Sequence, residues 1–268
     1  MSELNQRPHL SGIRLHPIKS LDPVSVPEAR IGPNGGLELD RVWALFSTDG
    51  KWINGKRAPA IHLIRAVYKP DLSGVGLSAP EDHRGIKPIR LKFPEDTERA
   101  SKWFSDYFEQ PVTVRYACEG QPDDGLAPGP TIVSTASLQS VSDWFPGIPL
   151  NEARERFRAT LEVAGVPAFW EDQLFGPDEN YVVRFKIGDV AFEGSNPCAR
   201  CPVPPRNPRT GEDWLGFSKH YSDMRRNTLP SWSPEPRFDH FYRLSTNTRV
   251  PGTEQGKLLR LGDPVALS

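Results

Sequence analysis

The chain has 268 residues, of which 33 are basic and 34 acidic, and its formal net charge is −1. This balance gives no electrostatic footprint for nucleic acid, which needs a basic face, and no apolar run reaches the about 18 residues that a membrane span requires. Three cysteines, an odd and small number, are typical of a reducing compartment rather than of a disulfide-rich secreted protein. Because residues 1–6 also lack the pattern of a signal peptide, we expect a cytoplasmic protein.

The first part of the chain reads as short strands with one helix. Apolar and polar residues alternate from Ile13 to His16, as in a half-buried strand. Asp49-Gly50 predicts a hairpin turn. A helix that begins at Asp96 or Thr97 carries aromatic residues at helical spacing and ends before Pro111. Further strand-like pieces lie at residues 37–46, 64–68, 89–93 and 112–116.

The second part is also predicted to be rich in strands. Residues 121–130 form a Pro/Gly/Asp-rich link, and a second helix is expected at residues 137–145. Two Gly-Asp pairs, at 188–189 and 262–263, suggest a barrel built from related hairpins, and no βαβ alternation is apparent. We therefore predict a mainly β (α+β) protein: a β-barrel-like domain, residues 1–112, followed by a β-barrel with a few helices, residues 113–268.

The segment Asn196-Pro197-Cys198-Ala199-Arg200-Cys201-Pro202 carries the strongest chemical signal. Zinc is one interpretation, although a structural zinc site needs four ligands and no second pair of ligands is apparent. A thioredoxin-like redox pair is another, although proline flanks this pair on both sides. The remaining interpretations are two inert buried thiols or a thiolate ligand for a soft metal, which Arg200 would favour.

This segment, followed by Asn207-Pro208-Arg209-Thr210-Gly211, resembles the signature Cys-x-Arg-Cys … Asp-Pro-x-Thr-Gly of the MOSC-domain family. Five further short matches lie in family order: His16-Pro17-Ile18-Lys19-Ser20, Leu39-Asp40-Arg41-Val42-Trp43, Ser134-Thr135-Ala136-Ser137-Leu138, Arg156-Phe157-Arg158-Ala159-Thr160 and Trp170-Glu171-Asp172. The closing turn Leu261-Gly262-Asp263-Pro264-Val265 completes the series. The chain is thus similar to the mARC-like and YcbX-like branch, which pairs an N-terminal MOSC β-barrel domain with a MOSC domain.

The resemblance implies a mononuclear molybdenum held by the dithiolene sulfurs of a pterin and by one protein cysteine. The matching cysteine is Cys201, which would be both the metal ligand and the catalytic residue, whereas Cys198 would be structural. Cations and hydroxyls at family positions would hold the cofactor and its phosphate: Lys19, Ser20, Arg41, Ser137, Arg158, Thr160 and Arg200. Thr160 stands where the family usually has Asn. The Thr hydroxyl can donate and accept a hydrogen bond but lacks the paired N–H donors of the Asn amide. Ser137 could equally serve only to cap a helix.

The implied activity is the two-electron reduction of an N-hydroxylated or N-oxide compound by a molybdenum-dependent oxidoreductase. Electrons would come from a separate protein, either a ferredoxin or a b-type cytochrome with its reductase. Two alternatives are a sulfur carrier that bears a persulfide on Cys201 and a non-enzymatic store for the cofactor. The resemblance also admits pyridoxal phosphate as a ligand. One further expectation comes from spacing: Arg154, Arg156 and Arg158 would share one face of a strand, where an anion or carboxylates must offset their charge.

Overall fold

The structure is a computed structural model that describes residues 7–80, 85–120, 122 and 124–267. Residues 1–6, on which the absence of a signal peptide was judged, lie outside the described residues, as do Gln121 and Asp123 of the predicted link. The described chain is mainly β, with four α-helices, as expected for an α+β protein. None of its helices has both the length and the apolar character needed to cross a bilayer.

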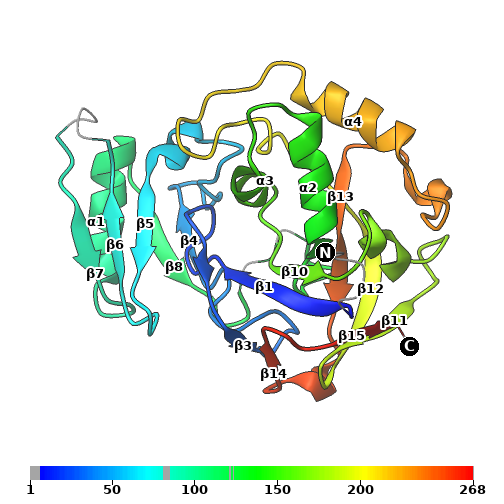
Figure 1. Ribbon diagram of the computed structural model, residues 1–268. Coiled ribbons are helices and arrows are strands. Elements are labelled where there is room, and N and C mark those ends of the chain that lie inside the picture. Colours follow the sequence, from blue (N-terminus) through cyan, green and yellow to red (C-terminus); the bar gives the residue numbers. More distant parts are fainter. Residues whose placement is uncertain (1–6, 81–84, 121, 123, 268) are drawn as a thin grey trace.

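The helices and strands follow one another through the chain as shown in Figure 1. The helices are α1 Thr97–Phe108, α2 Thr135–Trp144, α3 Leu150–Phe157 and α4 Phe217–Asn227. The strands are β1 His9–Leu15, β2 Val24–Ser25, β3 Glu28–Arg30, β4 Trp43–Phe46, β5 Arg65–Tyr68, β6 Val75–Ser78, β7 Ile89–Leu91, β8 Thr113–Tyr116, β9 Ile132–Ser134, β10 Leu161–Ala164, β11 Val183–Ile187, β12 Val190–Ala199, β13 Arg243–Arg249, β14 Leu258–Arg260 and β15 Val265–Leu267.

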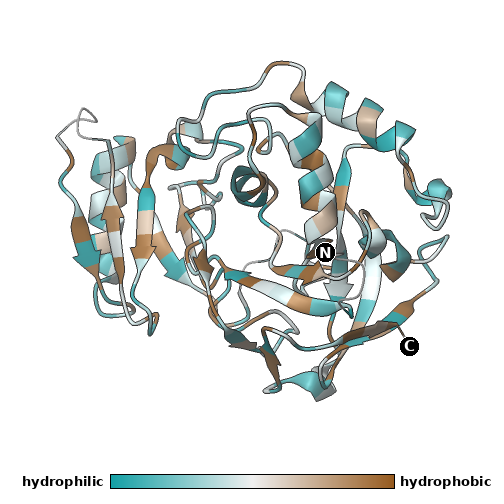
Figure 2. Cartoon of the chain, viewed as in Figure 1, coloured by the Kyte–Doolittle hydropathy of each residue, from teal (hydrophilic) through white to brown (hydrophobic). Residues whose placement is uncertain are grey.

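One eight-stranded sheet organises the larger side of the molecule, in the order β15-β11-β12-β13-β9-β10-β1-β2. The predicted strand near Ile13 is confirmed as β1, in which apolar and polar residues alternate (Figure 2) and Leu10, Ile13 and Leu15 are buried. The two sides of the sheet approach each other, because the amides of Leu10 and Val265 donate to the carbonyl groups of Asp263 and Pro8. These bonds do not form a continuous ladder, so the described strands make no closed barrel.

A smaller unit contains α1, the sheet β5-β6-β7 and the pair β4-β8, and it lies at one side of the molecule (Figure 1). The predicted helix is confirmed as α1, whose Trp103, Phe104 and Tyr107 are buried against the strands. The hairpin at Asp49-Gly50 is also confirmed, since Phe46 bridges to Trp52 across the turn.

Three expectations about the second half are wrong. Residues 150–157 form helix α3 and not a strand, because Ala153 and Phe157 bury one helical face behind Pro149. β9 and β10 are parallel and are joined through α2 and α3, so one βαβ-like crossover is present. The turn at 262–263 is no hairpin, since β14 pairs with β3 and β15 pairs with β11.

The two ends of the chain share a core. Apolar residues of β1 and β3 pack with those of β9 to β12 and of β14 and β15 in one buried cluster. A second cluster fills the smaller unit, and a third lies among α2, α3 and α4. This arrangement brings the loops after β1 and β3 against the loops around β10 and β12, where the candidate site lies.

Candidate functional site

A cavity of about 470 Å³ is lined by loops from both halves of the chain. Its walls include residues 19–20, 40–41, 54–56 and 62 from the first half and residues 156–158, 160, 196, 198–201 and 203–204 from the second. Seven of the eight predicted site residues line it: Lys19, Ser20, Arg41, Arg158, Thr160, Arg200 and Cys201. Positions as distant in sequence as 19 and 201 therefore meet in one place.

The cysteine segment lies at the end of β12 and in the turn that follows. Cys198 and Cys201 are both unpaired thiols, partly exposed, and both line the cavity. Arg200 lies between them in sequence and is fixed by its backbone amide, which donates to the carbonyl oxygen of Tyr242 at 3.0 Å. In the described ranges no three His, Cys, Asp or Glu side chains are arranged to hold a metal ion.

The guanidinium of Arg200 contacts Cys198 and the end of α3. Its Nη1 donates to Sγ of Cys198 at 3.2 Å, and its Nη2 donates to the carbonyl oxygen of Phe157 at 2.6 Å. Burial disfavours the charged guanidinium, but attraction by Cys198 and Cys201 raises the pKa of Arg200 above its usual value. Arg200 was expected to act on Cys201. In the structure it also makes a direct contact with the thiol of Cys198.

Lys19, Ser20 and Arg41 come from the loops after β1 and β3. Lys19 is only 4% exposed, and its Nζ lies 3.9 Å from the centre of the Trp52 ring, a cation–π contact that holds the amine in place. Ser20 and Arg41 have positive φ angles of 75° and 53°. Such backbone conformations are costly for residues with a Cβ and are often found at functional sites.

Asp40 anchors this part of the wall. Its carboxylate forms an ion pair with Arg41 and accepts a hydrogen bond from the backbone amide of His16 at 2.7 Å. Burial by itself would raise the pKa of Asp40, but Arg41 and the hydrogen bonds from His16 lower it to about 2. Arg41 also reaches the hydroxyl of Thr160 at 3.5 Å, so Thr160 contacts a cavity cation.

Arg158 follows α3 directly and has a left-handed backbone, with φ of 53°. Its Nη2 donates to the carbonyl oxygen of Leu21 at 2.7 Å, which ties the end of α3 to the loop that carries Lys19. The three arginines do not line one strand face, because Arg154 and Arg156 are two positions apart on helix α3 and Arg158 lies beyond its end in a left-handed conformation. Arg154 pairs with Glu162 at 2.8 Å and Arg156 with Glu152 at 2.6 Å, so carboxylates offset both charges.

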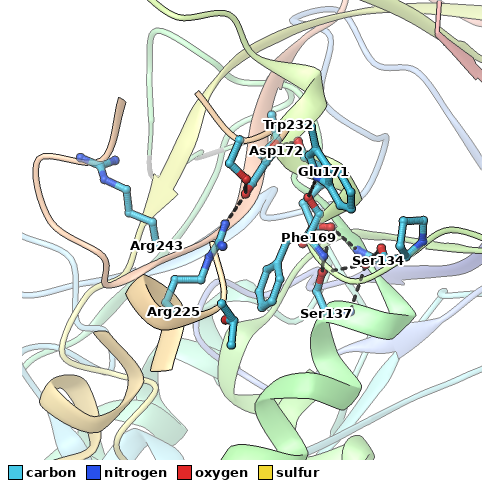
Figure 3. A network of polar contacts seen from close by, with 12 residues as sticks. Ser134, Ser137, Phe169, Glu171, Asp172, Arg225, Trp232 and Arg243 are labelled. Atoms are coloured by element: carbon cyan, nitrogen blue, oxygen red, sulfur yellow. Dashed lines mark hydrogen bonds and ion pairs between the residues drawn. The ribbon is translucent and has the colours of Figure 1, made fainter. Parts of the chain in front are cut away.

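Ser137 is the one predicted site residue that does not line this cavity. It lies in the first turn of α2, where its amide donates to the hydroxyl of Ser134, the N-cap, at 3.0 Å. Its own hydroxyl donates to Glu171 at 2.9 Å (Figure 3). The interpretation of Ser137 as a helix cap is therefore wrong, because Ser134 is the cap and Ser137 lies within the helix.

Glu171 and Asp172 form a buried polar network with Arg225 of α4 (Figure 3). Asp172 accepts from Arg225 and from the hydroxyl of Ser233. Burial, assisted by the neighbouring charge of Asp172, raises the pKa of Glu171 to about 7. The network joins η2, a 3₁₀ helix at Trp170–Leu174, to α4, and η2 also contacts β12, the strand that leads into the cysteine segment.

Sequence reasoning did not assign to the site six acidic, basic or histidine residues of the cavity wall: Asp40, Lys56, His62, Glu119, Asp124 and Arg156. The sequence could have indicated Asp40, because it directly precedes Arg41 and its carboxylate can pair with that arginine. No such signal existed for His62, since it lies in a short 3₁₀ helix, η1 Pro59–Leu63, far in sequence from every motif.

The wall chemistry suits an anionic ligand that also contacts a thiol. Five buried or half-buried cations line it, Lys19, Arg41, Arg156, Arg158 and Arg200, and Asp40, Glu119 and Asp124 lie on the same wall. Burial, and then the charge of Arg158, lower the pKa values of His16 to about 3 and of His62 to about 4. Two buried nitrogen atoms of lining residues, Nε of Arg200 and Nε2 of His62, make no hydrogen bond within the described part of the chain.

Comparison with known proteins gives two adjacent family matches. Residues 7–111 match the MOSC N-terminal beta barrel domain, and residues 131–266 match the MOSC domain. The chain is 25% identical to mitochondrial amidoxime reducing component 2 of Bos taurus, over 98% of this chain and 84% of that protein. The corresponding protein of Homo sapiens is 24% identical over 94% of this chain and 81% of its own length.

A molybdenum cofactor sulfurase of Drosophila grimshawi is 24% identical over 77% of this chain. This chain spans only 29% of the length of that sulfurase.

Proposed function

Because the chain belongs to the family of proteins that combine a MOSC N-terminal beta barrel domain with a MOSC domain, we propose that it binds the molybdenum cofactor in the cavity described above. The observation that carries the proposal is the cavity itself, in which Cys201 shares one wall with cations from both matched segments. The division of the chain into residues 1–112 and 113–268 is part of the same proposal.

Each part of the wall has a role in this proposal. Cys201 supplies the thiolate ligand, the soft ligand type that such a metal accepts. Lys19, Arg41 and Arg158 hold the anionic part of the cofactor, with Ser20 and Thr160 adding hydroxyl groups. Arg200 fixes the cysteine segment against the end of α3 and places positive charge beside both thiols. Ser137 acts indirectly, by holding Glu171 behind the wall.

The proposed reaction is the reduction of an N-hydroxylated or N-oxide compound. For an N-hydroxy group, R–NHOH takes up two electrons and two protons and gives R–NH₂ and water. The bound cofactor would supply the two-electron chemistry, and the protein supplies binding, orientation and electrostatics. Electrons come from a separate redox protein, a ferredoxin or a b-type cytochrome with its reductase. The names of the two amidoxime reducing components support this choice of substrate.

Metal analysis tests the proposal most directly. Full-length protein made in a host that synthesises the cofactor is expected to contain about one molybdenum per chain, to release the pterin on denaturation, and to reduce an N-hydroxylated test compound with a chemical reductant. One zinc per chain and no molybdenum would contradict the proposal.

Sulfur transfer is a second candidate, supported by the sulfurase relative and by the partly exposed thiol of Cys201. A carrier would bear a persulfide on a reactive, exposed thiolate such as that of Cys201. It would have no need for Lys19, Arg41 and Arg158 around one cavity. Cyanide-labile sulfur on Cys201 in protein that lacks molybdenum would favour this candidate.

A further inference from the structure

His62 is placed between two cavities of very different size. It lines the large cavity, and it also lines an adjoining one of about 20 Å³, together with Arg65, Arg158 and Arg206. A space of this size holds about one water molecule. None of the sequence motifs includes His62, and its nitrogen Nε2 is a buried atom without a hydrogen bond among the described residues.

The charged groups around His62 come from several elements. Arg158 follows α3, Arg206 and Asp213 lie in the segment after the cysteines, and Arg65 is in β5. Asp22 and Glu155 also line the small cavity, where Asp22 pairs with Arg65 at 3.0 Å and Glu155 pairs with Arg209. Burial, then Arg158, Arg206 and Arg65, lower the pKa of His62 to about 4, and Asp213 offsets only part of this. The imidazole is therefore neutral at pH 7 while the cavity holds no anion.

His62 is also adjacent to the cysteine segment. A Cβ added to Gly55 would lie 2.8 Å from Nε2 of His62 and 3.2 Å from Cγ2 of Val203. The two side chains therefore approach the same face of Gly55, and Val203 is two residues beyond Cys201. Arg206 holds this glycine by donating to its carbonyl oxygen.

We propose that His62 is a proton-linked anion contact, which takes up one proton from solvent when a tetrahedral dianion binds at the Arg158 side of the cavity. The proton adds to whichever ring nitrogen lacks one, and the imidazolium, with both nitrogens protonated, can then donate a charge-assisted hydrogen bond to the anion. Burial and the neighbouring guanidinium groups keep the imidazole neutral, and a bound dianion would oppose both by stabilising the added positive charge. Only the identity of the natural anion, the phosphate of the pterin cofactor, rests on the proposed function.

The linkage has a calculable size. If the bound dianion raises the pKa of His62 from about 4 to about 7, affinity rises about tenfold between pH 8 and pH 6, with uptake of about 0.9 proton at pH 6. Sulfate is the suitable probe, because it stays doubly charged over this range, whereas a phosphate ester titrates near pH 6 itself.

The test uses the full chain made without the cofactor, sulfate as titrant, and calorimetry at pH 6 and pH 8. Repeating the pH 6 titration in two buffers with different ionisation enthalpies counts the protons taken up. Wild type and the control His240→Gln, a change at an exposed histidine paired with Asp239, are expected to bind sulfate with proton uptake. His62→Gln is expected to bind sulfate more weakly at pH 6, without uptake, and with the same affinity at pH 8.

Three results would overturn the inference: sulfate binding by wild type without proton uptake, uptake that persists in His62→Gln, or no sulfate binding at pH 6. NMR of the His62 ring gives an independent readout, because the pKa of His62 must rise when sulfate is added. Molybdenum content of protein from a competent host is measured separately. A chain that contains molybdenum but takes up no proton with sulfate would refute this inference and leave the proposed function intact.

Discussion

We expect the substitution Arg158→Ala to weaken cofactor binding while the protein stays folded. Arg158 lines the cavity, and its guanidinium also donates to the carbonyl oxygen of Leu21 at 2.7 Å. Its left-handed backbone is no more strained in alanine, because both residues carry a Cβ. The substitution therefore removes the side-chain contacts without changing the turn that follows α3.

The expected loss follows from the contacts that a guanidinium makes with an anion. A hydrogen bond to a charged group contributes roughly 1.5–3 kcal/mol, which is about ten- to a hundredfold in affinity. The lost bond to the carbonyl oxygen of Leu21 also has a charged donor, so its removal costs roughly 1.5–3 kcal/mol of folding free energy. Arg158→Ala should thus lose much of its bound molybdenum but remain folded.

Arg154→Ala is the matched control on the same helix. Arg154 donates to the buried Glu162 at 2.9 and 2.8 Å and does not line the cavity. Removing the Arg154 side chain deletes charge-assisted hydrogen bonds to the carboxylate of Glu162, which is 2% exposed. The free energy of unfolding should therefore fall by roughly 1.5–3 kcal/mol. Molybdenum per folded chain should stay at the wild-type value.

The assay measures molybdenum and protein in the same sample, with circular dichroism and thermal unfolding as controls for folding. Both variants are produced under limiting molybdate, so that a weakened site is not simply saturated. Full occupancy in Arg158→Ala under these conditions would refute the anion pocket. Equal loss of molybdenum in both variants would mean that destabilisation, and not a lost contact, explains the result.

Three further predictions concern other residues of the site and its support. Cys201→Ser should abolish reduction of N-hydroxylated compounds and change the metal spectrum, whereas Cys198→Ser should retain most activity; the reverse outcome would assign the ligand to Cys198. The pKa of Glu171 is raised from 4.5 to about 7, so its carboxyl favours folding most below pH 4.5 and loses that contribution as pH rises through 7. In urea unfolding, the free energy of unfolding of Glu171→Gln should therefore be about 1–3 kcal/mol higher than that of wild type at pH 8, and the difference should be smaller at pH 5. Burial opposes ionisation of Glu162, but hydrogen bonds from Arg154, Thr135 and Arg14 lower its pKa to about 2, so its contribution is present above pH 4.5 and lost as pH falls toward 2. Glu162→Gln should accordingly be less stable than wild type at pH 7 and should approach it near pH 2–3; a constant difference would contradict the pKa assignment.

Local patterns in the sequence determined several elements correctly. The helical spacing of Trp103, Phe104 and Tyr107 predicted α1, and alternation around Ile13 predicted β1, because each pattern reports which face of one element is buried. The Asp49-Gly50 turn is equally local. The cysteine segment and the motifs around it indicated the family, which the two domain matches confirm.

The tertiary structure alone decided which residues meet. Arg154, Arg156 and Arg158 fit a strand by charge alternation, yet burial of Ala153 and Phe157 makes the segment a helix and sends the three guanidinium groups to different partners. Ser137 belongs to a family motif but faces Glu171 and not the cavity. His62 carries no signal in its own segment, since its neighbours Arg158 and Arg206 are distant in sequence. Periodicity describes one element at a time, whereas a cavity wall and its electric field arise only when separate elements pack together.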